Sequence, residues 1–459
     1  MAIVAGIVCE YNPFHNGHML QINKLRREHD AEAIVCVMGG NFLQRGEPAV
    51  VGKQRRVMMA LACGADLVVE LPAMYATRSA YWFALGSVSL LAAIGVTHLA
   101  FGAETDDLPA LRATAERLVN PDSAYTDGLR RYLGAGLSYA EAQAKALLDG
   151  GHSAFVPVLP NDRLALSYLR VVAEKSFPLT PILIPREGIA FHDASLPFGN
   201  GASPPAVGTA ALPGANPVQN NHHLPFGNVN MGDDAFAVPA PSPASATAIR
   251  GRLAEAVLAY GANTLSLAQL SAIGMAAYIP AAALPWLADT PLVSPRDAAP
   301  VQLALLRRAS LESLQALPDM TEGLEYRVLN AAGKANSLEE FYYRMKTKRY
   351  TLTRLQRMAA HLLIDYRQEH AAALREGPPY LRILGANSTG HQLIRRIRKT
   401  APLPVITRTS QMKALAKESP HAASAWDIEL RATAMHSLLS GSDFSEGNPE
   451  YFLSTITMP

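Results

Sequence analysis

The sequence predicts an α/β fold, with a doubly wound parallel sheet followed by a mainly helical, basic C-terminal region. Strand and helix patterns alternate regularly over residues 2–104. Residues 264–459 show mostly helical patterns instead. Between Tyr326 and Ser410 there are 16 Lys and Arg against 5 Asp and Glu, although the whole chain carries only +2. A segment this basic on a nearly neutral chain favours a polyanionic partner.

The composition is that of a soluble globular protein. A chain of 459 residues is long for one core, so we expect two or three domains. Hydrophobic residues make up 49% and charged residues 17%, and no apolar run reaches membrane-spanning length. We see no secretory signal pattern. Cys9, Cys36 and Cys63 lie beside apolar residues and form no CxxC pair, which favours buried thiols in a reducing cytoplasm.

The N-terminal elements predict right-handed βαβ units. We expect strands at 2–9, 33–38, 66–71 and 97–101, and helices at about 18–29, 53–63 and 79–93. Ligands of such sheets bind beyond the carboxyl ends of the strands. His15, the run Gly39-Gly40-Asn41 and the run Gly102-Ala103-Glu104 each follow a strand. We therefore expect them to gather at one edge of the sheet.

The next part of the chain is helical and then changes in composition. Residues 108–147 are helical in pattern, and a further helix extends to about 175 with Asn161 as its expected N-cap. A strand at 181–184 precedes Arg186. Residues 194–244 are rich in Pro, Gly, Asn and Ala, and they contain Leu-Pro-Phe-Gly-Asn twice. This composition predicts a mobile, low-complexity insertion.

The stretch from Cys9 to His18 carries the clearest chemical signal. Proline restricts the residue before it, so Asn12-Pro13 ends the first strand. His15 and His18 then lie at the start of a helix, where unpaired N–H groups and the helix dipole attract phosphate. Gly17 permits a close approach to the backbone, and the two imidazoles can donate hydrogen bonds to charge developing at phosphorus. The pattern indicates nucleotidyl transfer, with a helix cap, a surface pair or half a metal site as alternatives.

Two later stretches also suit phosphate. Ser245 opens a helix and is an expected N-cap, while Thr247 and Arg250 near the same helix start could hold a phosphate. The stretch 343–357 interleaves basic, aromatic and hydroxyl side chains with few acids. This pattern favours RNA binding, with a solvated charged face as the alternative. A strand at 381–387 and a basic helix at 391–399 follow.

The motifs resemble a known family. The run from Glu10 to His18 resembles the HxGH nucleotidylyltransferase superfamily, which has a Rossmann-like domain. The run Ser245 to Arg250 resembles its second motif, SSTxxR, with Ala246 replacing the second Ser. With the blocks 38–48, 64–72 and 347–357, the chain is similar to the bacterial tRNA(Met) cytidine acetate ligase family over most of its length outside 194–244.

The resemblance implies an ATP-dependent ligase. It would activate acetate as acetyl-adenylate, release pyrophosphate, and pass the acetyl group to N4 of the wobble cytidine of elongator tRNA(Met). ATP would come with Mg²⁺, although no metal-ligand pattern is evident, and neither a membrane nor a protein partner is expected. Two alternatives stay open: an adenylyltransferase for a small phosphorylated metabolite, and a tRNA-binding protein with a non-catalytic nucleotide pocket.

The resemblance also implies site residues. His15 and His18 would be catalytic. The ATP-binding set would be Ile7, Val8, Cys9, Glu10, Tyr11, Asn12, Pro13, Phe14, His15, Asn16, Gly17, His18, Met19, Leu20, Gly102, Asn161, Arg186, Thr247 and Arg250. The tRNA-binding set would be Lys346, Lys348, Arg349, Arg354 and Arg357.

We expect four regions in the chain. Residues 1–193 form the HxGH nucleotide-binding α/β domain, and residues 194–244 form the insertion. Residues 245–335 hold the second phosphate motif and further helices. Residues 336–459 form the basic tRNA-binding region.

Overall fold

The computed structural model describes residues 2–149, 156, 159–185, 245–321 and 323–458. Two predictions lie outside these described residues: the phosphate-binding role of Arg186, and the insertion at 194–244 with its repeated pentapeptide. All other candidate site residues fall within the described ranges.

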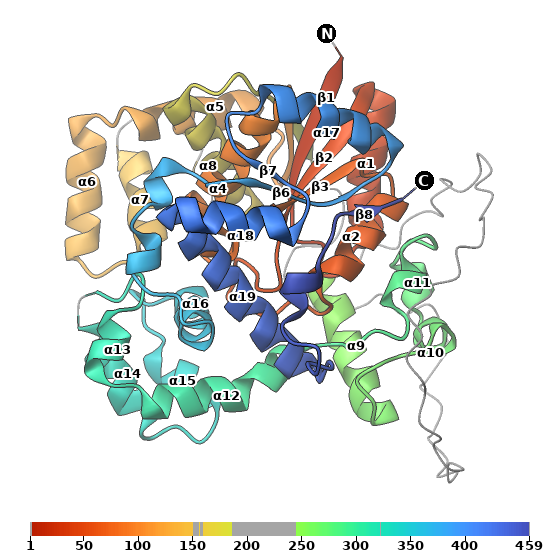
Figure 1. Cartoon of the computed structure of the whole chain (residues 1–459). Helices are drawn as coiled ribbons and strands as arrows, with labels where there is room; N and C mark the ends of the chain where they lie inside the picture. The colour runs from red at the N-terminus through yellow and green to blue at the C-terminus, as the bar shows by residue number, and fades with distance from the viewer. Residues whose placement is uncertain (1, 150–155, 157–158, 186–244, 322, 459) are drawn as a thin grey trace.

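A mixed sheet lies at the centre of the described chain, and helices cover both of its faces (Figure 1). The strand order is β5-β4-β1-β2-β3-β6-β7, and β8 pairs with β6. The strands are β1 (Ile3–Cys9), β2 (Ala31–Gly39), β3 (Leu67–Leu71), β4 (His98–Ala103), β5 (Thr180–Pro185), β6 (Leu381–Ala386), β7 (Val405–Ile406) and β8 (Ile456–Thr457).

The first five strands form the predicted parallel sheet. β1 pairs with both β2 and β4, β2 pairs with β3, and β4 pairs with β5, all in parallel. β2 and β3 extend the sheet to one side of β1, whereas β4 and β5 extend it to the other. In open α/β sheets, the crevice outside the strand ends at such a reversal binds ligands. The topology therefore predicts a ligand site at the carboxyl ends of β1 and β4.

The helices of the N-terminal part confirm the predicted alternation, with two differences at helix starts. They are α1 (Asn16–Glu28), α2 (Lys53–Ala62), α3 (Ala73–Ala76), α4 (Ala80–Ile94), α5 (Leu108–Val119), α6 (Ser123–Gly134), α7 (Tyr139–Asp149) and α8 (Pro160–Lys175). α1 begins two residues early because the His15 side chain caps it. The prediction that Asn161 caps α8 was wrong. Leu159 is the N-cap, and Pro160 occupies the first helical position, where its missing N–H costs nothing.

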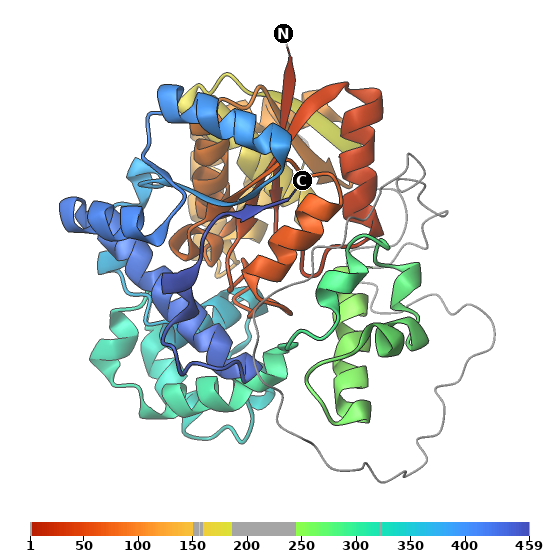
Figure 2. The same cartoon turned by 45° about the vertical axis from the view of Figure 1, so that its right-hand side comes forward.

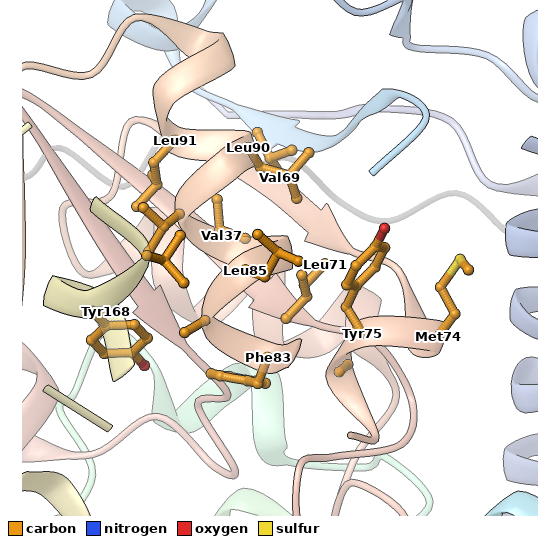
Figure 3. Packing of buried hydrophobic residues seen from close by; sticks show 14 of the residues in the cluster. Val37, Val69, Leu71, Met74, Tyr75, Phe83, Leu85, Leu90, Leu91 and Tyr168 are labelled. Atoms are coloured by element: carbon orange, nitrogen blue, oxygen red, sulfur yellow. The ribbon is translucent and has the colours of Figure 1, made fainter. Parts of the chain in front are cut away.

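Alternate residues of the strands face two separate hydrophobic cores. In β2, Val35 and Val37 belong to one core, and Cys36 and Met38 to the other. Figure 3 shows the first core, in which Val37, Val69 and Leu71 of the strands lie among Leu85, Leu90 and Leu91 of α4. Burial on both faces explains why the strands are almost continuously apolar. All three cysteines are buried free thiols, as predicted.

Most of α9–α16 lies at the lower end of the sheet in Figure 1, where α9–α11 are green and α12–α16 run from teal to cyan, whereas α17 lies at the upper end; Figure 2 shows the same arrangement from another side. Part of the second group has a core of its own, built from residues such as Leu306, Phe341 and Leu355. No described helix is both long and apolar enough to span a membrane. The helices are α9 (Ala246–Tyr260), α10 (Leu267–Ala272), α11 (Leu284–Leu287), α12 (Pro295–Arg308), α13 (Leu311–Gln315), α14 (Leu324–Ala332), α15 (Leu338–Met345), α16 (Leu352–Leu363), α17 (Ser388–Thr400), α18 (Thr409–Glu418) and α19 (Pro420–Ser440).

The C-terminal part also contributes to the sheet. The strand predicted at 381–387 is present as β6, and it pairs antiparallel with β3. β7 and β8 each add to β6 in parallel. The sheet therefore joins segments from both ends of the chain, which the sequence patterns did not indicate.

A buried ionic cluster fastens these two ends together. It consists of Lys53, Glu70, Arg382, Glu429 and Glu450, and we call it the Lys53 cluster. Lys53 Nζ lies 2.5 Å from Glu70 Oε1, 3.0 Å from Glu429 Oε1 and 2.8 Å from Glu450 Oε1. Arg382 Nη1 lies 2.9 Å from Glu70 Oε2 and also pairs with Glu450. The three carboxylates have the spacing of a metal site, but they already share two cations, Lys53 and Arg382.

The Lys53 cluster predicts a pH dependence of stability. Burial, together with the charges of Glu70 and Glu450, raises the pKa of Glu429 to about 7. The folded chain thus keeps a proton that the unfolded chain loses near the ordinary glutamate pKa. The stability gained from this bound proton is fully present below the pKa of the unfolded chain. It is lost as the pH rises through about 7, the pKa in the folded chain.

Glu429→Gln should remove this pH-dependent loss of folding stability. Between about pH 5 and pH 7.5, the wild-type free energy of unfolding should fall by roughly 1–3 kcal/mol more than that of the variant. Burial alone would raise the pKa of Glu70, yet Arg382 and Lys53 lower it to about 2, so Glu70 titrates outside this window. Urea unfolding of both proteins at the two pH values measures the difference. Parallel pH profiles would mean that Glu429 is ionised in the folded chain throughout.

Candidate active site

The two histidines lie at the N-terminus of α1, directly beyond β1. His15 is the N-cap residue, and its Nδ1 accepts the N–H of Gly17 at 3.1 Å. His18 Nδ1 accepts the N–H of His15 at 3.2 Å. The two side chains thus form a reciprocal capping box, normally built from Ser or Thr and Glu. The helix cap, one of the alternatives to phosphate binding for these two histidines, is therefore present.

The cap also determines which ring nitrogen of each histidine carries the proton. Because each Nδ1 accepts a backbone N–H, each neutral ring must carry its proton on Nε2. The rings of His15 and His18 are stacked, with centroids 3.7 Å apart and planes at 25°. His18 also contacts the rings of Tyr11 and Phe14, at centroid distances of 4.8 and 5.4 Å. The cap thus fixes two Nε2–H donors side by side.

Gly17 is required by packing at this helix start. A Cβ atom at position 17 would lie 2.9 Å from His15 Cε1 and 3.1 Å from His15 Nδ1. Contacts this short would displace the His15 ring. The glycine between the histidines therefore makes room for the cap.

The second motif closes on the first. Ser245 caps α9, as predicted, by accepting the N–H of Ala248 at 3.1 Å. Arg250 Nη1 donates to the carbonyl of Asn12 at 3.0 Å, and Nη2 lies 3.4 Å from Thr247 Oγ1. Glu47 lies 3.8 Å from the same guanidinium. Thr247 and Arg250 are thus brought to the loop after β1, although 194–244 separates them from it in sequence.

A buried arginine that the sequence analysis missed organises the loops at this edge. The guanidinium of Arg56 donates to the carbonyls of Glu10 at 2.7 Å, Gly39 at 2.9 Å and Val51 at 3.1 Å, and it also bonds Gly40. It therefore joins the ends of β1 and β2. The signal was the pair Arg55-Arg56 directly before the apolar run of this helix.

The end of β4, the strand next to β1, is held to the start of α8 by hydrogen bonds. Asp162 accepts the N–H groups of Glu104 at 2.9 Å and Thr105 at 3.0 Å. Glu104 in turn accepts the N–H of Asp162 at 2.9 Å and the amide of Asn161 at 2.6 Å. These bonds tie the N-terminus of α8 to the strand end just after Gly102. Asn161 is thus connected to the end of β4 by its hydrogen bond to Glu104.

The predicted ATP-binding segment divides into two kinds of residue. The side chains of Ile7, Cys9, Tyr11, Phe14 and Met19 belong to the hydrophobic core, so only their backbone could face a nucleotide. Gly17 is exposed and His18 is half-buried. The accessible chemistry therefore concentrates at the start of α1.

The predicted tRNA-binding residues also divide. Lys346, Lys348 and Arg349 are exposed in the segment between α15 and α16. Arg354 Nη2 donates to the Asp319 carbonyl at 2.8 Å, and burial lowers the pKa of Arg357 to about 10. The first three can meet a phosphate directly, whereas the last two surround Asp319.

Comparison with known proteins places the chain in a family. The family description HIGH Nucleotidyl Transferase matches residues 1–235 and 230–448. The tRNA(Met) cytidine acetate ligase of Syntrophomonas wolfei is 35% identical over 96% of this chain and 95% of its own length. The chain belongs to the tRNA(Met) cytidine acetate ligase family. The ligase of Anoxybacillus flavithermus is 32% identical, covering 89% of this chain and 90% of its own.

Solved structures of this ligase family have the same fold. Thermotoga maritima TmcAL in its apo form matches with a TM-score of 0.80 at 25% identity, covering 99% of this chain and 100% of its own. The form bound to alpha-thio ATP matches with a TM-score of 0.77 at the same identity and coverage. The ligase fold thus accommodates an ATP analogue in a relative that aligns over the whole described chain.

Proposed function

We propose that this protein is an ATP-dependent ligase that activates acetate as acetyl-adenylate and acetylates N4 of the wobble cytidine of elongator tRNA(Met). The observation that carries the proposal is the capping box of His15 and His18, met by Arg250 from the second motif, in a member of this ligase family.

The first step suits this geometry. An acetate oxygen bonds to the α-phosphorus of ATP, and the bond from that phosphorus to the bridging oxygen breaks, releasing pyrophosphate. Negative charge gathers on the phosphoryl oxygens as this happens. The Nε2–H groups of His15 and His18 donate to those oxygens, and Arg250 balances the charge of the departing pyrophosphate. Because these groups are fixed before the reaction, they need little reorganisation.

The second step consumes the adenylate. N4 of cytidine bonds to the acetyl carbon, the bond from that carbon to the AMP oxygen breaks, and N4 gives up one proton. Adenylation makes this possible because AMP is a far better leaving group than oxide. No covalent intermediate on a protein side chain is required.

Mg²⁺ would enter with the nucleotide. Glu10 Oε1 already accepts the N–H of Gln44 at 2.7 Å, and the carboxylates of the Lys53 cluster are paired with Lys53 and Arg382. The described residues near the site thus provide no ready carboxylate cage, so the cation would be held by the phosphate oxygens.

The proposal is tested by measuring pyrophosphate release from ATP, with and without acetate and with and without bacterial tRNA. We expect release to require acetate and acetylcytidine to appear in the digested tRNA. Pyrophosphate release that does not depend on acetate but increases with a phosphorylated metabolite would favour the adenylyltransferase alternative. ATP binding without any turnover would favour an RNA-binding protein.

Lys348→Ala combined with Arg349→Ala should weaken tRNA binding. Loss of two phosphate contacts should reduce the slope of log affinity against log salt by about two units, while acetate adenylation stays intact. Filter binding over a salt series measures both quantities. Arg130→Ala, which removes a guanidinium that is 76% exposed on α6, is the control. An unchanged salt slope in the double variant would remove these two residues from the RNA interface.

A further inference from the structure

A pocket lies outside the candidate active site. It has a volume of about 560 Å³, within the range of roughly 300–1,000 Å³ that is usual for ligand sites. Six side chains supply its chemistry: Tyr81, Trp82, Tyr139, Arg170, Glu174 and Arg375. They come from α4, α7, α8 and the 3₁₀ turn Leu374–Glu376, so distant parts of the chain meet here. We call it the Trp82 pocket.

Aromatic rings and guanidinium groups alternate around the Trp82 pocket. The rings of Tyr81 and Trp82 meet edge to face, with centroids 5.2 Å apart. The Arg170 guanidinium lies 4.9 Å from the Tyr81 ring, and that of Arg375 lies 5.7 Å from the Trp82 ring. Tyr139 is 54% exposed at this pocket, a large exposure for an aromatic residue. Such a mixture of rings and cations is typical of sites on which unpaired bases stack.

One donor of the pocket lacks a hydrogen bond and lies beside a carboxylate that is held in place. Arg170 Nε is buried and has no hydrogen-bond partner in the described chain. It lies 3.9 Å from Glu174 Oε2, too far for a hydrogen bond. Glu174 Oε1 accepts the hydroxyl of Tyr81 at 2.8 Å, which holds the carboxylate in place. The edge of a nucleobase presents an acceptor next to an amino or imino donor, which complements this pair.

The pocket connects to the active-site loop and to the basic segment. Gln44 donates its N–H to Glu10 and its side-chain amide to the Arg78 carbonyl, at 2.7 and 3.2 Å. The Arg78 guanidinium lies 5.9 Å from the Trp82 ring, and its Nη2 lies 3.2 Å from Asp319 Oδ1. Arg354 bonds the carbonyl of that same Asp319. Arg78 and Asp319 therefore link the Trp82 pocket to Arg354, near the end of the basic segment.

We propose that the Trp82 pocket binds an unstacked nucleobase of the RNA substrate, by stacking on its aromatic rings and by hydrogen bonds to Arg170 and Glu174. The proposal rests on the proposed function, because it supplies a base-binding element to the RNA interface. The phosphates of the same strand would meet the basic residues of 346–357.

The test compares two labelled single-stranded RNAs of equal length, one with bases and one with abasic sugars, by fluorescence anisotropy. Tyr139→Ala, Trp82→Leu and Arg170→Gln are measured beside Phe452→Ala, which removes an aromatic side chain that is 63% exposed outside the pocket. We expect each pocket variant to weaken binding of the base-containing RNA by roughly 10-fold. Affinity for the abasic RNA should stay within about 2-fold of wild type. The salt slope should not change in Tyr139→Ala, because no phosphate contact is lost.

Equal losses with both RNAs would overturn the proposal, because the pocket would then act through the backbone or through folding. Unchanged affinity in Tyr139→Ala and Trp82→Leu, at wild-type melting temperature, would overturn it as well. Tyr139 is exposed enough for its variant to fold even if Trp82→Leu does not. If wild type bound neither RNA nor tRNA, the tRNA part of the proposed function would fail, which is a different result.

Discussion

His18→Ala is expected to lower acetate-dependent pyrophosphate release by roughly 10²–10³-fold, with only a modest loss of ATP affinity. The substitution removes one of the two Nε2–H donors that the capping box aims away from the helix. It also removes the acceptor for the His15 N–H, so the neighbouring donor loses part of its support. The effect should fall mainly on kcat, because the donors act on charge that develops during the reaction.

Steady-state pyrophosphate release and equilibrium ATP binding separate these effects. His29→Ala, at the C-terminal end of the same helix, is the matched control and should retain activity. A His18→Ala enzyme with wild-type kcat would exclude transition-state donation by His18. A variant that lost ATP binding and activity equally would indicate a structural cap alone.

Lys53→Met is expected to destabilise the folded chain by roughly 3–5 kcal/mol. Lys53 is the cation shared by three carboxylates that are fully buried. Without it, Arg382 alone faces Glu70, Glu429 and Glu450. Since the Lys53 cluster fastens β3 to β6 and α19, the C-terminal strands should loosen first.

Urea unfolding followed by circular dichroism measures this loss. Lys399→Met, at an exposed position of α17, is the control and should change stability by less than about 0.5 kcal/mol. Adding Glu429→Gln to Lys53→Met should change stability little further, because Lys53 lowers the pKa of Glu429 and its loss leaves that carboxyl protonated. A stability loss below about 1 kcal/mol in Lys53→Met would mean that water or a bound ion replaces the ammonium.

The local patterns of the N-terminal part predicted its fold well. Strands such as Ile3–Cys9 are short, apolar and followed by turn signals, so their period and order are legible from the chain. The same applies to the place of His15, Gly17 and His18 at a helix start, which depends on residues within a few positions. Ser245 as a helix cap was predictable for that reason too.

Long-range contacts were not predictable from one sequence. The addition of β6 to β3, and the Lys53 cluster, join residues more than 300 positions apart. Glu70 was a usable signal, because a carboxylate within an apolar strand must find a buried partner, but the sequence does not name that partner. The Trp82 pocket is hidden in the same way, since its residues come from four separate elements.

The most direct test of the whole account uses acetate labelled with ¹³C at both carbons. The purified protein is incubated with labelled acetate, ATP and unmodified tRNA(Met), and the digested nucleosides are analysed by mass spectrometry. The account predicts N4-acetylcytidine carrying both labelled carbons, formed only when ATP is present and accompanied by AMP and pyrophosphate. Consumption of ATP without any labelled acetylcytidine would contradict it.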